Sequence, residues 1–180
     1  MRARYSLVLL IMSILLMTPG CVTAPTQPGA FPTFTPRPTS TPRPAPAFEL
    51  PTLDGDTLAL ADYAGQIVLI NFWASWCPPC TAEMSDFEAY YQAHKDAGFV
   101  IIAINLEESP DVVADFVERQ GLTFPVALDL NGRTFGEYGG RGLPTSFFVR
   151  RDGALLGYWP GALTVEMLED RLTPLIRGEN

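Results

Sequence analysis

Two cysteines separated by two prolines stand between a predicted strand and a predicted helix. Residues 67–73 are apolar apart from Asn71, which is typical of a central strand buried on both faces. Helical signals run from Pro78 to Asp96 and stop at Gly98. Cys77 therefore falls at the helix N-terminus, where free amides and the helix dipole favour a thiolate, and Cys80 lies one turn inside, within disulfide reach. The pattern indicates redox chemistry, in which Cys77 attacks a disulfide and Cys80 resolves the product.

A metal site is the alternative role for these cysteines. The chain has three cysteines and one histidine, and the third cysteine, Cys21, is distant in the sequence. Three cysteines fall short of the four thiolates of a structural zinc site, and no second cysteine pair exists. We therefore expect no bound metal or other cofactor. A non-enzymatic metal chaperone or binding lipoprotein stays open as an alternative.

The rest of the chain after residue 47 alternates strand-like and helix-like patterns. This alternation predicts an α/β fold, with a central sheet flanked by helices. Two short extended pieces around the turn at 54–56 predict an additional hairpin at the N-terminal side of this fold. The further expected elements are a strand at 99–104, a helix at 110–120 capped by Ser109, a hairpin of 145–150 and 154–159, and a last helix from Thr164 to about Pro174.

Composition sets limits on the partners. The 180 residues are 47% hydrophobic and 18% charged, enough apolar material for a core. Twenty acidic residues against 12 basic ones give a net charge of −8, the wrong sign for holding phosphate backbones. We therefore expect no nucleic-acid partner.

The first 20 residues have the layout of a signal peptide. Arg2 and Arg4 precede an apolar run from Leu7 to Met17, too short to cross a bilayer as a helix. Gly20 followed by Cys21 is similar to a bacterial lipobox, in which the cysteine receives lipid and becomes the new N-terminus. Thr18 departs from the usual leucine three positions before that cysteine. Cleavage without lipid is the alternative.

Residues 21–47 are predicted to be a disordered linker behind the anchor cysteine. From Val22 to Ala47 the chain has eight prolines, six threonines and no acidic residue. Such a stretch has too little apolar surface to offset the entropy of ordering. We expect three parts: the signal peptide at 1–20, the anchor and linker at 21–47, and a folded domain at 48–180.

The sequence resembles a known family in two separated motifs. The first is the segment 71–80, Asn-Phe-Trp-Ala-Ser-Trp-Cys-Pro-Pro-Cys, and the second is Gly142-Leu143-Pro144-Thr145. Together they are similar to thioredoxin-fold proteins of the membrane-tethered TlpA/ResA type, over about residues 48–175. The resemblance implies a cis bond before Pro144, which faces the disulfide, and main-chain pairing of Leu143 with the substrate.

The position of a proton-accepting carboxylate differs from thioredoxin. Thioredoxin has a buried Asp in its central strand, where this chain has Asn71, which cannot exchange a proton. At 100° per residue, Glu83 falls inside the apolar arc of the helix that contains Cys80. A carboxylate there is partly desolvated, with a raised pKa suited to proton exchange with Cys80. The resemblance implies the same role for Glu83, while favourable dipole chemistry remains the alternative from spacing alone.

These residues predict a thiol:disulfide oxidoreductase that acts as a reductase. Pro78 and Pro79 remove two amide donors beside Cys77, so its thiolate gains less stabilisation and the pair is a weak oxidant. We expect Trp76, both prolines and Leu143 to line the substrate site. The resemblance implies disulfide-containing exported proteins as substrates, with apocytochrome c as a candidate, and a membrane thiol-transfer protein as electron donor. A peroxiredoxin is the alternative enzyme, disfavoured because Ala74 lacks the hydroxyl that orients a peroxide.

Overall fold

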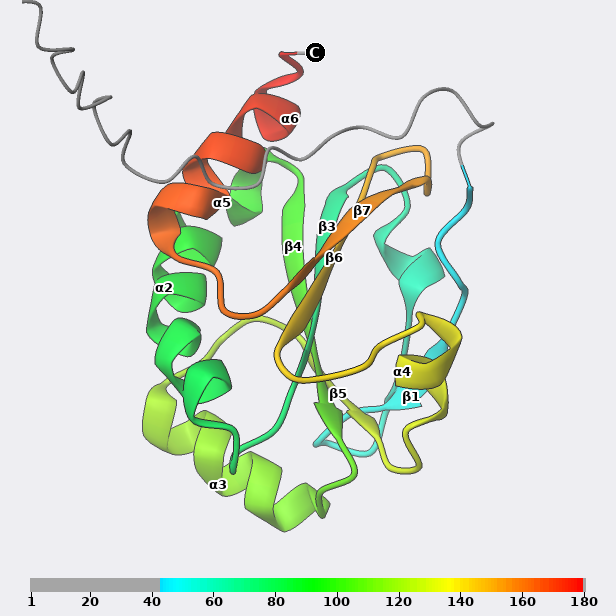
Figure 1. The fold of residues 1–180 in the computed structure, drawn as a ribbon, viewed down its shortest axis with the longest axis vertical. Coiled ribbons are helices and arrows are strands. Elements are labelled where there is room, and N and C mark those ends of the chain that lie inside the picture. The colour runs from blue at the N-terminus through cyan, green and yellow to red at the C-terminus, as the bar shows by residue number, and fades with distance from the viewer. Residues whose placement is uncertain (1–42, 180) are drawn as a thin grey trace, which may run out of the picture. The chain divides into compact units, whose positions relative to one another are not determined.

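The computed structural model describes residues 43–179, and their centre is a mixed five-stranded sheet (Figure 1). The strand order is β5-β4-β3-β6-β7, with β3, β4 and β5 parallel and β6 and β7 antiparallel to their neighbours. The strands are β3 (Ile67–Trp73), β4 (Phe99–Leu106), β5 (Val126–Asp129), β6 (Thr145–Val149) and β7 (Leu155–Pro160). All seven residues of β3 are buried, which confirms the predicted central strand.

Two apolar clusters cover the two faces of this sheet. One face packs against the helices α2 (Pro78–His94), α3 (Pro110–Gln120), α5 (Val165–Arg171) and α6 (Thr173–Arg177). The other face packs against the small hairpin β1 (Glu49–Pro51) and β2 (Thr57–Ala59), the 3-10 turn η1 (Leu60–Tyr63) and the chain around α4 (Arg133–Glu137). A second 3-10 turn, η2 (Lys95–Ala97), follows α2. The predicted thioredoxin-like α/β fold with an N-terminal hairpin is confirmed.

The predicted helix ends agree with the structure in position, with one difference in chemistry. Ser109 is the N-cap residue of α3, but its side chain makes no capping hydrogen bond. Thr164 caps α5 as predicted, accepting a hydrogen bond from the Met167 amide at 3.4 Å. The last helix is interrupted at Leu172, two residues before Pro174, so that α5 and α6 are separate.

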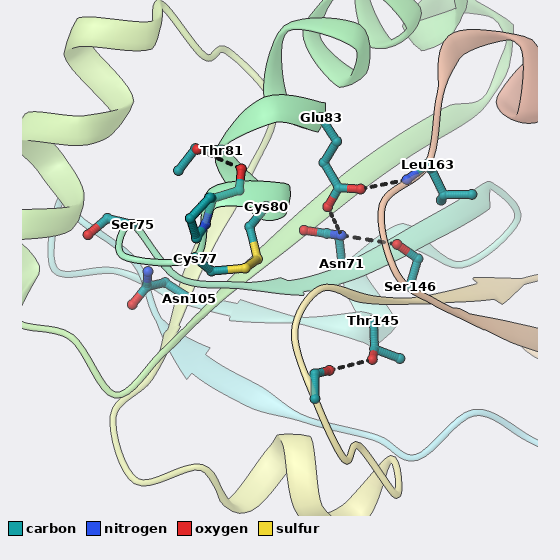
Figure 2. Close-up of a disulfide and its surroundings, with 12 residues drawn as sticks. Asn71, Ser75, Cys77, Cys80, Thr81, Glu83, Asn105, Thr145, Ser146 and Leu163 are labelled. Atoms are coloured by element: carbon teal, nitrogen blue, oxygen red, sulfur yellow. Dashed lines mark hydrogen bonds between the residues drawn. A yellow bond between two sulfur atoms is a disulfide. The ribbon is translucent and has the colours of Figure 1, made fainter.

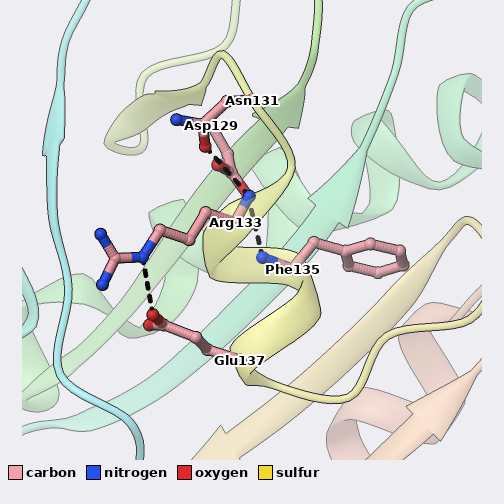
Figure 3. A network of polar contacts seen from close by, with 5 residues as sticks. All are labelled: Asp129, Asn131, Arg133, Phe135 and Glu137. Carbon is pink, nitrogen blue, oxygen red and sulfur yellow. Dashed lines mark hydrogen bonds and ion pairs between the residues drawn. The ribbon is translucent and has the colours of Figure 1, made fainter.

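Two elements were not predicted from the sequence, namely β5 and α4. Helix α4 has five residues and begins after Gly132, whose φ of 68° only glycine adopts easily. Figure 3 shows what holds its first turn: Asp129 at the end of β5 accepts a hydrogen bond from the Phe135 amide at 2.8 Å. Arg133 and Glu137 form an ion pair across the helix at 2.9 Å. The N-cap residue, Gly132, has no side chain to cap α4, and the Asp129 carboxylate at the end of β5 takes that role.

Residues 43–47 were expected to belong to the linker, but they pair with the folded domain. Pro44 forms an isolated bridge with Ala154 beside β7, and the Ala45 amide donates to the Gly153 carbonyl at 3.0 Å. Tyr138 donates to the Pro46 carbonyl at 2.7 Å. These contacts correct the boundary expected at Phe48, because the hydrogen bonds of the domain already begin before that residue.

The predictions for the earlier segment lie outside the described residues. They are the signal peptide at 1–20, the anchor at Cys21 and the linker as far as residue 42. Within residues 43–179, no helix is both long and apolar enough to span a membrane.

Candidate active site

Cys77 and Cys80 form a disulfide at the junction of β3 and α2 (Figure 2). The sulfur atoms are 2.05 Å apart and the Cα atoms 5.3 Å apart. Cys77 is the N-cap residue of α2, and its carbonyl accepts the first helical hydrogen bond, from the Thr81 amide at 3.1 Å. Cys77 retains 5% exposure whereas Cys80 has none. The more accessible cysteine is therefore the one at the helix N-terminus.

The exposed residues around the disulfide are those expected to meet a substrate. Trp76 is 67% exposed, an unusual surface position for so large an apolar ring. Pro78 and Pro79 are exposed at the first two helical positions. Because neither proline has an amide hydrogen, Cys80 contributes the only backbone donor of the first three helical residues.

The segment before β6 forms the opposite wall of the site. The Leu143–Pro144 peptide bond is cis, which confirms the expectation from the family resemblance. Thr145 closes the turn by donating to the Gly142 carbonyl at 2.6 Å. Strand register pairs Thr145 with Phe72 of β3, so this turn lies at the same end of the sheet as the disulfide. Leu143 is half-buried against the apolar cluster that contains both cysteines.

Glu83 is a buried carboxylate on the helix turn after Cys80, only 2% exposed. One carboxylate oxygen, Oε1, accepts a hydrogen bond from Asn71 Nδ2 at 2.9 Å, and the other, Oε2, accepts one from the Leu163 amide at 2.8 Å. Burial raises the pKa of Glu83 to about 7, although the two hydrogen bonds act in the opposite direction. The expected desolvation of Glu83 is confirmed. Its carboxyl can therefore gain or lose a proton near neutral pH.

Asn71 stands where thioredoxin has an aspartate, and its amide joins three elements. Nδ2 donates to Glu83 of α2 and to Ser146 Oγ of β6, the latter at 3.0 Å. Asn71 itself belongs to β3 and is fully buried. The amide therefore holds the carboxylate against the sheet without being able to titrate.

A second acidic residue, Glu108, fixes the loop that leads into Cys77, a role that was not predicted from the sequence. Its Oε2 accepts hydrogen bonds from the Ser75 amide and from Asn105 Nδ2, both at 2.7 Å, and its Oε1 accepts one from the Ser75 hydroxyl at 2.5 Å. The preceding residue, Glu107, has a φ of 58°, which is uncommon for a residue with a side chain. This backbone conformation turns the chain after β4, and no sequence pattern marked the contact in advance.

Trp73 belongs to the core and not to the surface of the site. Its ring is fully buried and packs on Phe116 of α3, with centroids 4.9 Å apart. The structure thus separates the two tryptophans of the motif, since Trp76 is exposed. Among the described residues, no group of three or more His, Cys, Asp and Glu side chains gathers as metal ligands would.

Comparison with known proteins agrees with this geometry. A family model described as AhpC/TSA matches residues 42–156. The chain belongs to the AhpC/TSA family. The thiol-disulfide oxidoreductase ResA of Bacillus thuringiensis (strain Al Hakam) is 40% identical over 128 residues, which are 71% of this chain and 74% of the relative. ResA of Oceanobacillus iheyensis is 36% identical over 140 residues, 76% of this chain and 73% of the relative.

Solved structures of similar proteins share the fold. A thiol:disulfide interchange protein of the thioredoxin family from Chlorobium tepidum TLS superposes with a TM-score of 0.69 at 30% identity, covering 77% of this chain and 99% of that one. StoA from Bacillus subtilis gives 0.61 at 32% identity, covering 70% and 96%. With the Cys77–Cys80 pair in place, the chain is a thiol-disulfide oxidoreductase.

Proposed function

We propose that this enzyme is an extracytoplasmic, membrane-tethered reductase of disulfides in exported proteins. The observation that carries the proposal is the disulfide itself: one sulfur lies at a helix N-terminus beside exposed Trp76, and the other is buried next to a carboxylate. This asymmetry suits a two-step exchange in which an outer thiol meets the substrate and an inner thiol releases it.

In the first step, the Cys77 thiolate attacks one sulfur of the substrate disulfide. A Cys77–substrate bond forms, the substrate disulfide breaks, and the departing sulfur leaves as a thiolate. In the second step the Cys80 thiolate attacks the Cys77 sulfur and releases the second substrate thiolate. Two electrons have then passed to the substrate, and the enzyme carries the disulfide described above.

Glu83 is the proposed proton acceptor for Cys80 before the second step. A carboxyl group with a pKa of about 7 can take a thiol proton at neutral pH and return it later. We assign substrate contact to Trp76, Pro78, Pro79 and Leu143, with Pro144 facing the disulfide. These side chains surround the outer sulfur without offering a charge, so recognition there relies on apolar and main-chain contacts.

The membrane location rests on the sequence before the described residues. Lipidation at Cys21 and the Pro/Thr-rich linker would hold the domain outside the cytoplasm, and a membrane thiol-transfer protein would recharge the enzyme with electrons. Apocytochrome c is one candidate among exported substrates. Labelling with a radioactive fatty acid tests the anchor: we expect incorporation in the parent chain and none in Cys21→Ala, whereas equal labelling of both would exclude Cys21 as the lipid site.

Reduction of insulin disulfides tests the activity, with peroxide consumption and metal titration run in parallel. We expect insulin reduction that depends on Cys77, with peroxide consumption no faster than in Cys77→Ser and no stoichiometric metal binding. Rapid Cys77-dependent peroxide consumption without insulin reduction would replace this function with the peroxidase alternative. Tight metal binding by the reduced pair would favour the chaperone alternative.

A further inference from the structure

The side-chain amide of Asn71 is satisfied at one end and not at the other. Nδ2 donates to Glu83 and Ser146, whereas Oδ1 is buried and has no hydrogen-bond partner. Figure 2 shows the Oδ1 end of Asn71 directed toward the side of the disulfide, away from Ser146. A buried acceptor without a donor is energetically costly, so its orientation toward the disulfide side calls for a physical reason.

The oxidation state of Cys80 supplies that reason. The sulfur of Cys80 is bonded to that of Cys77 and carries no hydrogen, so it cannot donate to Asn71 Oδ1. Reduction adds an S–H donor at this position. Cys80 lies three residues before Glu83 on α2, so the two side chains share one helix face, and Asn71 of β3 lies against that face.

We propose that Asn71 is a positioning residue whose amide adopts two orientations and so couples the proton on Cys80 to the proton on Glu83. The proposal rests on the function assigned above, in which Cys80 is the resolving thiol and Glu83 its proton acceptor. In the first orientation Cys80 holds the proton: its S–H donates to Oδ1, and Nδ2 donates to the Glu83 carboxylate as in the structure described.

In the second orientation Glu83 holds the proton. The S–H bond of Cys80 has broken, an O–H bond has formed on Glu83 Oε1, and no electron has moved. The amide turns over, so that Oδ1 accepts from the new Glu83 hydroxyl and Nδ2 donates to the Cys80 thiolate. Ser146 adapts by turning its hydroxyl from acceptor to donor. In each of these two orientations, both ends of the Asn71 amide face a suitable partner. If the proton moves and the amide does not turn, two acceptors or two donors face each other.

Among the groups around Glu83, the Asn71 amide is the one that can couple its proton to that of Cys80. The pKa of Glu83 responds to burial, to the Leu163 amide and to Asn71, with no charged side chain among the causes. The Leu163 amide belongs to the connection between β7 and α5 and holds Oε2 in both orientations. The neighbours facing the carboxyl from α2, β3 and β6 are Cys80, Asn71 and Ser146. Only the Asn71 amide offers both a donor and an acceptor on one rigid group.

Titration of Cys80 tests the coupling without relying on turnover. In the full chain with Cys21→Ser and Cys77→Ser, Cys80 is the only thiol, and its thiolate is followed by ultraviolet absorbance. We compare the fraction of Cys80 present as thiolate at one pH below the titration midpoint. We expect Asn71→Leu to lower this fraction by roughly tenfold, because the Cys80 thiolate loses the Nδ2 donor. Asn71→Asp keeps the shape but cannot donate when ionised, and we expect at least the same fall.

Ser146→Ala is the matched control, because it removes a neighbour of the same amide but leaves both of its ends. We expect it to change the thiolate fraction less than about twofold. A thiolate fraction that stays within twofold of the parent in both Asn71 variants would overturn the proposal. If Asn71→Leu does not fold, Asn71→Asp still provides the test.

Nuclear magnetic resonance of the Asn71 side-chain amide is the direct observation. In the reduced full chain we expect its nitrogen and hydrogen signals to shift over the same pH range as Cys80, and to stay constant in Glu83→Gln. Signals that do not move in the parent, or that move equally in Glu83→Gln, would contradict the switch. Insulin reduction by the parent separates the two proposals, since loss of turnover refutes the function and a static amide refutes only the switch.

Discussion

The two ends of the sheet differ in how completely their polar groups are paired. At the end away from the disulfide, the Arg151 guanidinium donates to four backbone carbonyls, those of Gly65, Ala97, Gly98 and Ile176, at 3.0–3.2 Å. At the disulfide end, Asn71 Oδ1, Trp73 Nε1 and Asn105 Oδ1 are buried without partners. His94 Nε2 is the only other buried side-chain atom of the described residues without a hydrogen bond, and it lies 3.5 Å from Glu169 Oε1.

This difference separates stability from chemistry. The Arg151 contacts join the starts of β3 and β4 to the C-terminal helix, which closes this end of the sheet with charged donors. The unpaired acceptors at the other end, Asn71 Oδ1 and Asn105 Oδ1, raise the energy of the oxidised protein locally and leave room for the protons that reduction adds. Substitutions at the two ends should therefore have different readouts, stability at one and thiol chemistry at the other.

The largest effect is expected at the disulfide. Cys77→Ser should abolish insulin reduction, because the accessible nucleophile is lost. Cys80→Ser should still attack and accumulate a mixed disulfide, since the resolving thiol is missing. Non-reducing gels with a disulfide-containing substrate measure both. Adducts that form with Cys77→Ser and not with Cys80→Ser would reverse the two roles.

Glu83 should make stability depend on pH. Its carboxyl has a higher pKa in the folded protein than in the unfolded chain, so the folded state binds the proton more tightly. Stability due to this group is complete below pH 4.5, the ordinary pKa of a glutamate, and is lost as pH rises to about 7. The loss is on the order of 3 kcal/mol, since one pKa unit corresponds to about 1.4 kcal/mol.

Urea unfolding at several pH values measures this loss, and Glu83→Gln is the comparison. A glutamine side chain cannot ionise, so we expect the difference in unfolding free energy between the two proteins to change across this pH range. The glutamine variant should also slow resolution or shift its pH dependence. Parallel stability curves together with unchanged pH–rate profiles would show that Glu83 is an ordinary helix carboxylate.

Arg151→Ala should reduce stability by about 2 kcal/mol, because four carbonyls lose a charged donor at a partly solvated site. The adjacent Arg150 is the matched control, since within residues 43–179 its charge pairs with Asp152 in the same turn. We expect Arg150→Ala to leave stability close to that of the parent, and both variants to keep the parent reduction potential. A changed reduction potential in Arg151→Ala would contradict the proposal that one end of the sheet governs stability and the other governs thiol chemistry.

A smaller effect is expected at Glu108, which tethers the loop before Cys77. Glu108→Ala should lower the rate of insulin reduction several-fold, because Ser75 and Trp76 lose their fixed position, at a cost of about 1 kcal/mol. Trp76 fluorescence should change as well. Glu118→Ala, which replaces an exposed glutamate on α3, is the control. Equal rates in both variants would show that the tether has no part in catalysis.

The sequence predicted those features that depend on local pattern. The apolar run of β3, the proline that begins α3 and the Thr164 cap each specify an element within a few residues. β5 has only four residues and α4 begins without a side-chain cap, so neither has enough local signal to identify it. α4 depends instead on Asp129, which comes from the end of a strand.

The same distinction applies to the site. Cys77, Cys80 and Glu83 follow one another at helical spacing, so their common face is predictable from the sequence. Glu108 reaches Ser75 across 33 positions by way of the left-handed turn at Glu107, and no periodicity encodes that contact. The carbonyls paired with Arg151 and the unpaired Asn71 oxygen likewise become visible only when distant segments are brought together.

The reduction potential of the Cys77/Cys80 pair tests the reductase assignment most directly. Two prolines remove the amide donors that would otherwise stabilise the Cys77 thiolate, which should lower the potential by tens of millivolts. Equilibration of the full chain with glutathione or dithiothreitol buffers measures it. We predict a value below about −200 mV, in the range of reducing dithiol proteins. A value near about −120 mV, that of a strong oxidant, would contradict the assignment.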